Sequence, residues 1–535
     1  QFSALRSGQI QALSTEQIGS LKNTQIQHLA EANVTAMNTS QVAALTTSQL
    51  QVFNTAQIAA LSSAQLGGMG TDQVSSLKPN LISALRTEAI AGLSTTQMGA
   101  LSVSQIVQMS SQQIGALSDA QVAAISTTDV AALTGRQLSA MSTSQMQALT
   151  TDQITALKPS QVVSIPTQSM AALTAGQVSA FTAQQVAYLT NSQMGALTSA
   201  QVGALTTDQI PHLKAAQLAA VSTTGLAGLD STQIEAFSAV QIGGLRTDQI
   251  AALATDQIAA IASEDIRGLT RQQMAALQSD QVGSLTSDQV VAFNATQLAA
   301  IETQDLVALS TDNVVALTTE QMGAFTTAQI NNLSTDQIVA LETEDLNALK
   351  GTQIVALETG QFAAMSTDQI QSFKPSQIAS IETRDLAALN SDQIQALTSD
   401  QLPALTTYQF KNLTTDAMVA LTTDQITALS TKEISVMTDA QLSKLTTDQV
   451  AALTTAQVQA IPTTGLAAMG TDQVVAFTSE QLAAFTGNHM RVLTTDQMQA
   501  FTTDQMPGFE TRDLVVLTAT QLNATTSDQI DALTT

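Results

Sequence analysis

The sequence repeats every eight residues, and this period constrains the fold more than any other feature. With Leu421 as position 1, the chain reads Leu-Thr-Thr-Asp-Gln-Ile-Thr-Ala and then starts again. Stepping by eight from Leu5 to Leu533 gives 67 positions, all of them Leu, Ile, Val, Met or Phe except Thr525. No insertion or deletion breaks this register. We therefore expect residues 1–535 to form a single continuous array of about 67 octads with no internal domain boundary.

Three backbone conformations could carry such an octad, and geometry separates them. In one continuous α-helix the apolar stripe would drift by about 80° per octad, because each residue turns the helix by about 100°. In a β-strand, positions 1 and 6 would face opposite sides, and Gln, Asp and Ala are poor strand formers. The remaining option is an all-α solenoid of short helical segments, one for each octad. A narrow β-solenoid is the alternative.

Positions 1 to 6 of the octad carry the signals of a helix start. With Thr422 as the N-cap, Gln425 falls on the third helical residue, which is the spacing of a capping box. Leu421 before the cap and Ile426 at the fourth helical residue form a hydrophobic staple. Asp424 lies in the first turn, where the helix dipole favours an anion. Each octad thus predicts a new helix start, with positions 1 and 6 buried.

Proline and glycine indicate where each helical segment ends. Pro79, Pro159 and Pro375 occupy position 3, the first helical residue, where a missing amide costs nothing. Three further prolines lie at position 7, where a continuing α-helix would lose a hydrogen bond, and 15 of the 25 glycines lie at positions 7 and 8. We therefore expect about one and a half helical turns in each octad, with a bend near positions 7 and 8.

The number of octads in one coil of the solenoid stays open from the sequence. Position 5 is Gln in 51 of its 67 occurrences. Four of the exceptions, each five octads after the last, are Asp265, Asp305, Asp345 and Asp385. Five octads per coil would place these residues on one edge of the solenoid. Duplication of five-octad blocks in evolution would give the same spacing.

Composition and missing motifs exclude several classes of function. The chain has no Cys, which excludes disulfides, and its net charge of −25 argues against nucleic acid and anionic membranes as partners. No apolar run approaches the ~18 residues of a membrane span. His28, His212 and His489 are far apart in sequence, and we expect them to be solvated or capping side chains. No catalytic or cofactor-binding motif is present, so we expect no enzymatic activity.

Acidic pairs are the most distinctive polar feature of the octads. Glu at position 2 is combined with Asp at position 5 in every fifth octad over part of the chain. The pairs considered as metal ligands are Glu302 with Asp305, Glu342 with Asp345, and Glu382 with Asp385. Calcium takes six to eight oxygen ligands, and such carboxylates could hold it between coils. The alternative is a modified helix cap in which no metal takes part.

The octads that begin at Leu421 and Leu445 resemble the octapeptide arrays of very large, repetitive surface or secreted proteins of proteobacteria. Proteins of this kind are adhesin-like, and many carry a haem-utilisation label. The resemblance covers the whole chain and implies an extracellular or cell-surface location. Haem binding is not implied, because the chain has no Cys and its three His, with Tyr188 and Tyr408, form no repeated pair.

Two functions compete on these observations. The first is a structural extracellular protein that forms a fibre, sheath or adhesin stalk, as in a biofilm. The alternative is a surface binding module whose Thr, Ser and Asp ladders at positions 2 to 4 face calcium, carbohydrate, mineral or ice. Because neither end of the array has a polar capping unit, we expect self-association end to end or laterally. The chain is then a segment of a longer protein or one subunit of a filament.

Overall fold

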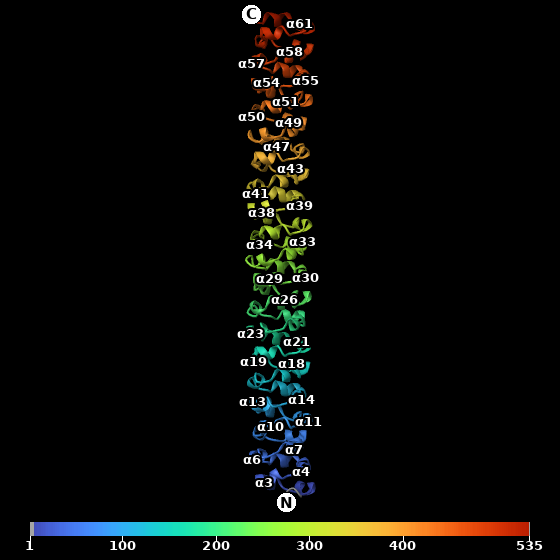
Figure 1. Ribbon diagram of the computed structural model, residues 1–535, viewed down its shortest axis with the longest axis vertical. Coiled ribbons are helices and arrows are strands. Elements are labelled where there is room, and N and C mark those ends of the chain that lie inside the picture. Colours follow the sequence, from blue (N-terminus) through green and yellow to red (C-terminus); the bar gives the residue numbers. More distant parts are fainter. Residues whose placement is uncertain (1–4, 534–535) are drawn as a thin grey trace. The chain divides into compact units, whose positions relative to one another are not determined.

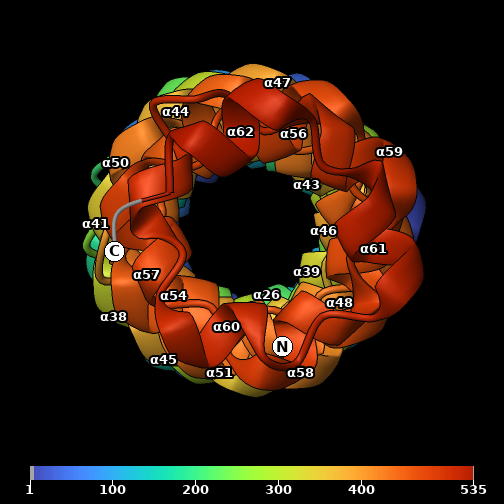
Figure 2. The same cartoon turned by 90° about the horizontal axis from the view of Figure 1, so that it is seen from above.

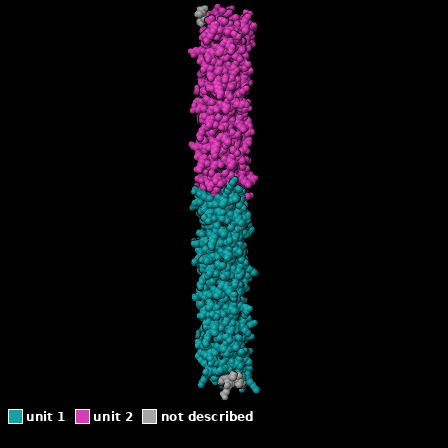
Figure 3. Space-filling model, in the orientation of Figure 1, with its two compact units in different colours: residues 1–276 teal, residues 277–535 magenta. Residues whose placement is uncertain are grey.

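A computed structural model describes residues 5–533 of the chain (Figure 1). Its contacts divide the chain into two compact units, residues 1–276 (unit 1) and residues 277–535 (unit 2), and each is described by itself (Figure 3). Over the described residues the chain forms 62 short α-helices and four segments of 3-10 helix, and no strand. The expected all-α solenoid of short helical segments is therefore confirmed, and the narrow β-solenoid is excluded.

The α-helices have four to six residues, and each begins at position 3 of its octad and ends at position 6, 7 or 8. In unit 1 they run from α1 (Ser7–Gln11) to α32 (Arg271–Met274). In unit 2 they run from α33 (Ser279–Gly283) to α62 (Ser527–Asp531). No helix in the described part of the chain is long and apolar enough to cross a membrane.

The octad of Leu421 shows how the sequence produces this pattern. Thr422 has an extended backbone with φ −75° and ψ 161°, and α50 (Thr423–Ala428) begins directly after it. The Thr422 Oγ1 accepts from the backbone N–H of Gln425 at 3.2 Å, and Oε1 of Gln425 accepts from the backbone N–H of Thr422 at 2.9 Å. The next position 1, Leu429, is extended again. The predicted capping box therefore forms, and the helix restarts in the following octad.

Positions 1 and 6 form the core, as expected. The side chain of Ile426 is 0% exposed and that of Leu421 is 4% exposed, and the same two positions are buried in nearly every octad. Gln425 at position 5 is buried with them, at 6% exposure. In Figure 2 the helices of unit 2 lie around a ring. The apolar side chains at positions 1 and 6 are the ones that burial removes from solvent.

Hydrogen bonds between coils give the length of one turn of the solenoid. Nε2 of Gln425 donates to the carbonyl oxygens of Ile394 at 2.9 Å and Leu397 at 2.7 Å, which lie 31 and 28 residues earlier. In the same unit, Nδ2 of Asn331 donates to the carbonyl of Ala356, 25 residues later. One turn therefore takes between 25 and 31 residues, or three to four octads. Five octads per coil is wrong, because neighbouring coils would then meet at an offset of five octads.

Proline and glycine mark the bends of the chain. Pro375 is the first residue of α45 (Pro375–Ile378), as predicted. The three prolines at position 7 each lie in a short 3-10 helix: η2 (Ile210–His212), η4 (Leu402–Ala404) and η5 (Met506–Gly508). At position 8 of unit 1, a Cβ atom on Gly92 would collide with the backbone of Ser63 on the preceding coil. Glycine is therefore needed there for close approach between coils.

Candidate functional site

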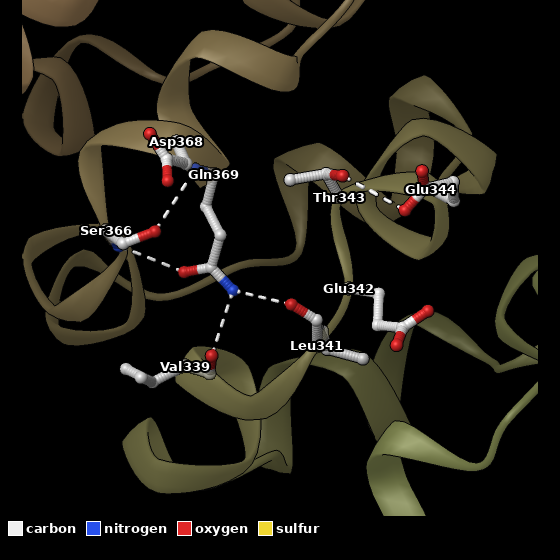
Figure 4. Close-up of a pocket in the computed structure, with 8 residues that line it drawn as sticks. All are labelled: Val339, Leu341, Glu342, Thr343, Glu344, Ser366, Asp368 and Gln369. Carbon is white, nitrogen blue, oxygen red and sulfur yellow. Dashed lines mark hydrogen bonds between the residues drawn. The ribbon is translucent and has the colours of Figure 1, made fainter.

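The most regular polar feature of both units is a row of buried Gln side chains at position 5. Gln369 shows the bonding, in which Oε1 accepts from the backbone N–H of Ser366 at 3.0 Å (Figure 4). Its Nε2 donates to the carbonyl oxygens of Val339 at 3.2 Å and Leu341 at 2.8 Å on the preceding coil. We call this arrangement the glutamine clamp: a position-5 Gln, the N-cap N–H of its helix, and the carbonyls 28 to 31 residues earlier.

The clamp explains why this position is so restricted in residue type. A buried amide left without partners costs about 1–3 kcal/mol, so both ends of the side chain must be bonded. Gln offers an acceptor and a donor on one neutral side chain of sufficient length. Lys and Arg carry only donors and cannot accept from the cap amide. One Gln therefore caps its own helix and joins it to the preceding coil.

Two other residue types take the place of Gln, and of these only His489 makes both bonds of the clamp. Nδ2 of Asn313 donates to the carbonyl of Leu285 at 2.9 Å, so it keeps the bond between coils. His489 accepts from the backbone N–H of Thr486 through Nδ1 at 3.2 Å and bonds the carbonyl of Ile461 through Nε2 at 2.9 Å. These partners assign the neutral tautomer with its proton on Nε2.

The three histidines differ in their surroundings. Burial lowers the pKa of His489, and the bond to the Ile461 carbonyl opposes this. His489 is thus the capping side chain that the sequence predicted, with an additional bond between coils. His28 and His212 are exposed. The structure does not bring the three together.

The predicted calcium ligands do not converge in the structure. Asp305, Asp345 and Asp385 occupy the clamp position and are at most 5% exposed. Their partners at position 2 face outward, since Glu302 and Glu342 are exposed and Glu382 is half-buried beside the guanidinium of Arg384. Over residues 5–533, no three His, Cys, Asp or Glu side chains gather closely enough to hold a metal ion. Calcium binding stays a prediction from the sequence, and the geometry here does not supply a set of ligands.

The modified-cap interpretation describes the same pairs only in part. Each Glu is the N-cap residue of its helix, as in α36 (Thr303–Leu306) and α41 (Thr343–Ala348). Neither Glu302 nor Glu342 makes a side-chain cap hydrogen bond to the helix it precedes. Oε2 of Glu302 accepts from the side chain of Gln304 at 3.0 Å and not from a helix N–H. Both helices therefore begin after an N-cap residue with the usual extended backbone, but the two Glu carboxylates do not act as capping groups.

Burial perturbs the Asp side chains at the clamp position. Burial raises the pKa of Asp345 to about 6, the charge of Glu342 adds to this, and a backbone hydrogen bond from Glu342 opposes it. Burial also raises the pKa of Asp385, against a hydrogen bond from Oγ1 of Thr359 at 2.6 Å and the charge of Arg384. Oδ2 of Asp345 and Oδ2 of Asp385 have no hydrogen-bond partner.

Beside the Gln369 clamp lies an open surface hollow of about 540 Å³ (Figure 4). Three carboxylates line it, those of Glu342, Glu344 and Asp368. Its one serine hydroxyl, that of Ser366, accepts from the backbone N–H of Gln369 at 3.2 Å. The hollow therefore presents carboxylates to solvent next to a hydroxyl that is already held in a helix cap.

Comparison with known families addresses the repeat directly. A family model described as the ALTTAQ repeat matches more than half of the chain, at residues 47–79, 122–159, 258–295, 298–335, 338–374, 378–415, 402–431, 418–455 and 450–487. The chain belongs to the ALTTAQ repeat family. A search of the curated proteins finds no match to it.

The ALTTAQ repeat matches also bear on the five-octad spacing of the Asp residues. Five of them begin at residues 258, 298, 338, 378 and 418, each five octads after the last. Because one coil takes only 25 to 31 residues, this spacing is a property of the sequence and not of the coil. Duplicated five-octad blocks are the interpretation that remains.

Sequence reasoning assigned the Gln of the ALTTAQ repeat to the helix cap and missed its donor role toward the preceding coil. A signal for that role was present, since Gln occupies 51 of 67 positions whereas Glu occupies one, Glu433. A capping box accepts Gln and Glu alike. Oε2 of Glu433 does accept from the backbone N–H of Ser430 at 2.7 Å, but an ionised carboxylate has no donor for the coil before it. The preference for Gln over Glu is therefore the mark of a bond between coils.

Proposed function

We propose that the chain is a structural repeat protein whose coils form the shaft of an extracellular fibre, sheath or adhesin stalk at a cell surface. The observation that carries this proposal is the glutamine clamp, which repeats from coil to coil within each unit. A solenoid bonded in this way is stabilised as a sum over neighbouring coils, so it can be lengthened without changing any one of them. The proposal assigns the chain no catalytic step, no cofactor and no nucleic-acid partner.

Self-association is part of this proposal, and an apolar cavity in the last coils of unit 2 supports it. The cavity has a volume of about 240 Å³. Its lining residues are Met490, Met498, Met506, Phe509, Leu514, Leu517, Leu522, Thr525, Ile530 and Leu533. In the inner coils of unit 2, position-6 side chains such as Ile426 are fully covered. We propose that further octads cover this cavity, either those of a longer chain or those of a second copy joined end to end.

Electron microscopy and X-ray scattering of the purified full chain, over a range of concentrations, test the proposal. Particles that lengthen with concentration support end-to-end association. Leu514→Glu places a charge on the half-buried wall of the cavity and should abolish the lengthening. The matched control is Val240→Glu in unit 1, where the side chain is 77% exposed. A monomer whose dimensions do not change with concentration would contradict end-to-end association of this chain.

A second candidate function is a surface binding module, and the charge of unit 2 favours it. Exposed carboxylates at position 4 recur in every third octad at Glu320, Glu344, Asp368, Asp392 and Asp416. They lie on helices that contact one another in succession: α38 (Thr319–Ala324), α41 (Thr343–Ala348), α44 (Thr367–Ser372), α47 (Ser391–Ala396) and α49 (Thr415–Ala420). Such a ladder is suited to calcium or to a mineral surface that presents cations.

Calorimetric titration of the full chain with calcium tests this second function. Replacing Glu344, Asp368 and Asp392 together by the matching amides removes the centre of the ladder and should remove the binding heat. The control replaces three exposed acidic residues that do not lie at position 4, namely Glu358, Asp439 and Asp531. Titration without heat in the unmodified chain would leave the structural role as the only proposal.

A further inference from the structure

Over the described residues of unit 2, three buried Asp side chains have an oxygen without a hydrogen-bond partner: Oδ2 of Asp345, Oδ2 of Asp385 and Oδ1 of Asp513. Asp345 and Asp385 lie among the inner coils of the unit and leave the clamp incomplete there. An ionised carboxylate only accepts hydrogen bonds, so it cannot bond a carbonyl on the preceding coil. Both residues are therefore gaps in a row of bonds that the neighbouring octads complete.

The octad after Asp345 shows what is missing. Nε2 of Gln353 donates to the carbonyl of Phe325 at 2.9 Å, which is 28 residues earlier. Counting the same 28 residues back from Asp345 leads to Leu317, whose carbonyl is the acceptor that a Gln at this position would bond. This carbonyl belongs to position 1, whose oxygen is the recurrent acceptor of the clamp.

A side chain as short as Asp can reach this acceptor. Nδ2 of Asn313 donates to the carbonyl of Leu285 at 2.9 Å, and Nδ2 of Asn33 in unit 1 donates to the carbonyl of Leu5 at 2.9 Å. Both acceptors lie 28 residues before the donor. A protonated Asp has the shape of Asn, with an O–H in place of an N–H. Length is therefore no obstacle, and the missing element is the proton.

We propose that Asp345 and Asp385 are joints between coils, by which we mean contacts with the preceding coil that become stronger when the Asp side chain is protonated. When the buried oxygen carries a proton, its O–H donates to the position-1 carbonyl at the offset of the clamp, that of Leu317 or Leu357, and completes the clamp. When the proton leaves, an unpaired negative charge remains between the coils and the joint loosens. This device goes beyond a structural role, because it makes the cohesion of particular coils depend on pH.

The surroundings of Asp345 favour the proton. The charged groups on its own octad and on the elements around it are Glu342, Glu344, Glu320 of α38, Asp368 of α44, and Asp312 of α37 (Thr311–Val315), the helix before Leu317. None of these elements carries a Lys or Arg, and Nζ of Lys374, after α44, donates to the carbonyl of Asn347. Burial and the repulsion of Glu342 together raise the pKa of Asp345 to about 6. Over residues 5–533 no three His, Cys, Asp or Glu side chains lie closely enough to hold a metal ion, and the neutralising group that this proposal assigns is a proton.

Asp385 has a more mixed environment and is the weaker of the two joints. Arg384 lies 3.4 Å from its Oδ1, and Thr359 donates to the same oxygen at 2.6 Å. The other charged or titratable groups are Glu382 on its own octad, Glu358 before α43 (Thr359–Ala364), Lys350 before α42 (Gly351–Val355), and Tyr408 and Lys411 on α48 (Thr407–Lys411). The cations favour the ionised form, so Asp385 should respond to pH over a lower range than Asp345.

Hydrogen exchange of the full chain, followed by mass spectrometry at about pH 5 and about pH 7.5 and corrected for intrinsic rates, tests the proposal. Peptides that cover residues 309–325 and 341–350 should be about tenfold better protected at the lower pH, given a folded pKa of about 6. The variant Asp345→Gln has the residue of most other octads at this position, so its protection from exchange should be high at both pH values. Asp345→Asn should behave in the same way, because Asn313 already forms this bond.

The matched control is Asp336→Asn, which removes one exposed carboxylate from position 4 of the preceding octad. It should keep the pH response of the unmodified chain. An equal response in the unmodified chain and in Asp345→Gln would overturn the proposal. Infrared spectra give a second readout: the protonated carboxyl band near pH 5 should be weaker in Asp345→Asn than in the unmodified chain, and bands of equal intensity would also overturn the assignment.

Discussion

Units 1 and 2 share the octad, the core and the clamp, but they differ in charge. Unit 1 has 14 acidic and 10 basic residues, a net charge of −4, whereas unit 2 has 29 acidic and 8 basic residues, a net charge of −21. Positions 1 and 6 are apolar and buried in both. The added carboxylates of unit 2 lie mainly at exposed position 4, with smaller gains at position 2 and at the clamp. The comparison teaches that the core sets the fold, while the surface can change its density of charge without altering it.

The same substitution at the clamp has different consequences in different octads. In unit 1, Asp129 accepts from Oγ of Ser126 at 2.5 Å, and Asp265 accepts from the backbone N–H of Ala239 at 2.7 Å. In unit 2, one oxygen of Asp345 has no partner. The neighbouring residues therefore decide whether an Asp in place of Gln is satisfied or left with an unpaired buried oxygen.

The largest effect should come from a charge in the core, and it should be equal in the two units. Ile154→Asp in unit 1 and Ile426→Asp in unit 2 each bury an unpaired carboxylate at a site that is 0% exposed. We expect a local loss of at least about 3 kcal/mol, confined to the adjacent coils. Hydrogen exchange measures it, with the exposed Thr427→Asp as control. Loss of protection throughout the chain would contradict the nearest-neighbour picture.

Removing one clamp should have the next largest effect. Gln153→Met in unit 1 and Gln369→Met in unit 2 keep the volume but lose the cap bond and the bonds to the preceding coil. We expect a cost of roughly 2–4 kcal/mol in each unit, because buried carbonyls lose their donor. Thermal unfolding and hydrogen exchange both report it. Gln371→Met changes an exposed Gln at position 7 of the same octad and should be nearly neutral.

His489 should give a pH response opposite to that of Asp345. Because burial lowers its folded pKa, the folded state binds fewer protons than the unfolded state. Its contribution to stability is present above the unfolded pKa of about 6.5 and is lost as the pH falls through the folded pKa. Protection of residues 486–492 should therefore decrease on acidification. His489→Gln should remove this decrease, and a decrease that persists in the variant would assign it to another group.

The smallest effect should be that of salt, and it tests the charge difference directly. Screening relieves repulsion among exposed carboxylates, so unit 2 should gain more protection than unit 1 when ionic strength rises from about 0.01 M to about 0.15 M. The gain should be below about 1 kcal/mol for any one coil. Choline chloride serves as the salt, so that metal-ion binding does not contribute. Equal gains in both units would show that the surface charge of unit 2 does not oppose folding.

Much of the local structure could be predicted from particular residues of one octad. The sequence predicts the N-cap at Thr422, the capping box with Gln425 and the buried face at Ile426. The structure forms all three as predicted. The position-7 prolines correctly indicated interrupted α-helices. The donor role of Gln425 could not be predicted in this way, because its acceptors lie 28 and 31 residues earlier in the chain.

The acidic pairs show the limit of the same reasoning at the candidate site. Spacing alone placed Glu342 and Asp345 together as carboxylates, and a metal ion between coils followed from that. The structure turns one outward and buries the other. Close spacing at a helix start does not determine which of two side chains meets solvent, because the neighbouring coils cover one of them.

The sequence by itself determined the unit of the fold: an eight-residue helix start with two buried apolar positions, repeated without a break. Those properties depend on residues within one octad, where backbone geometry and capping chemistry are local. Only the tertiary structure decided that three to four octads make a turn, which carbonyls on the preceding coil Gln bonds, and that Asp345 retains an unpaired buried oxygen. The physical reason is that these properties depend on the angle between successive short helices and on partners a full turn away. No pattern within one octad determines the angle between successive helices or the partners on the next coil.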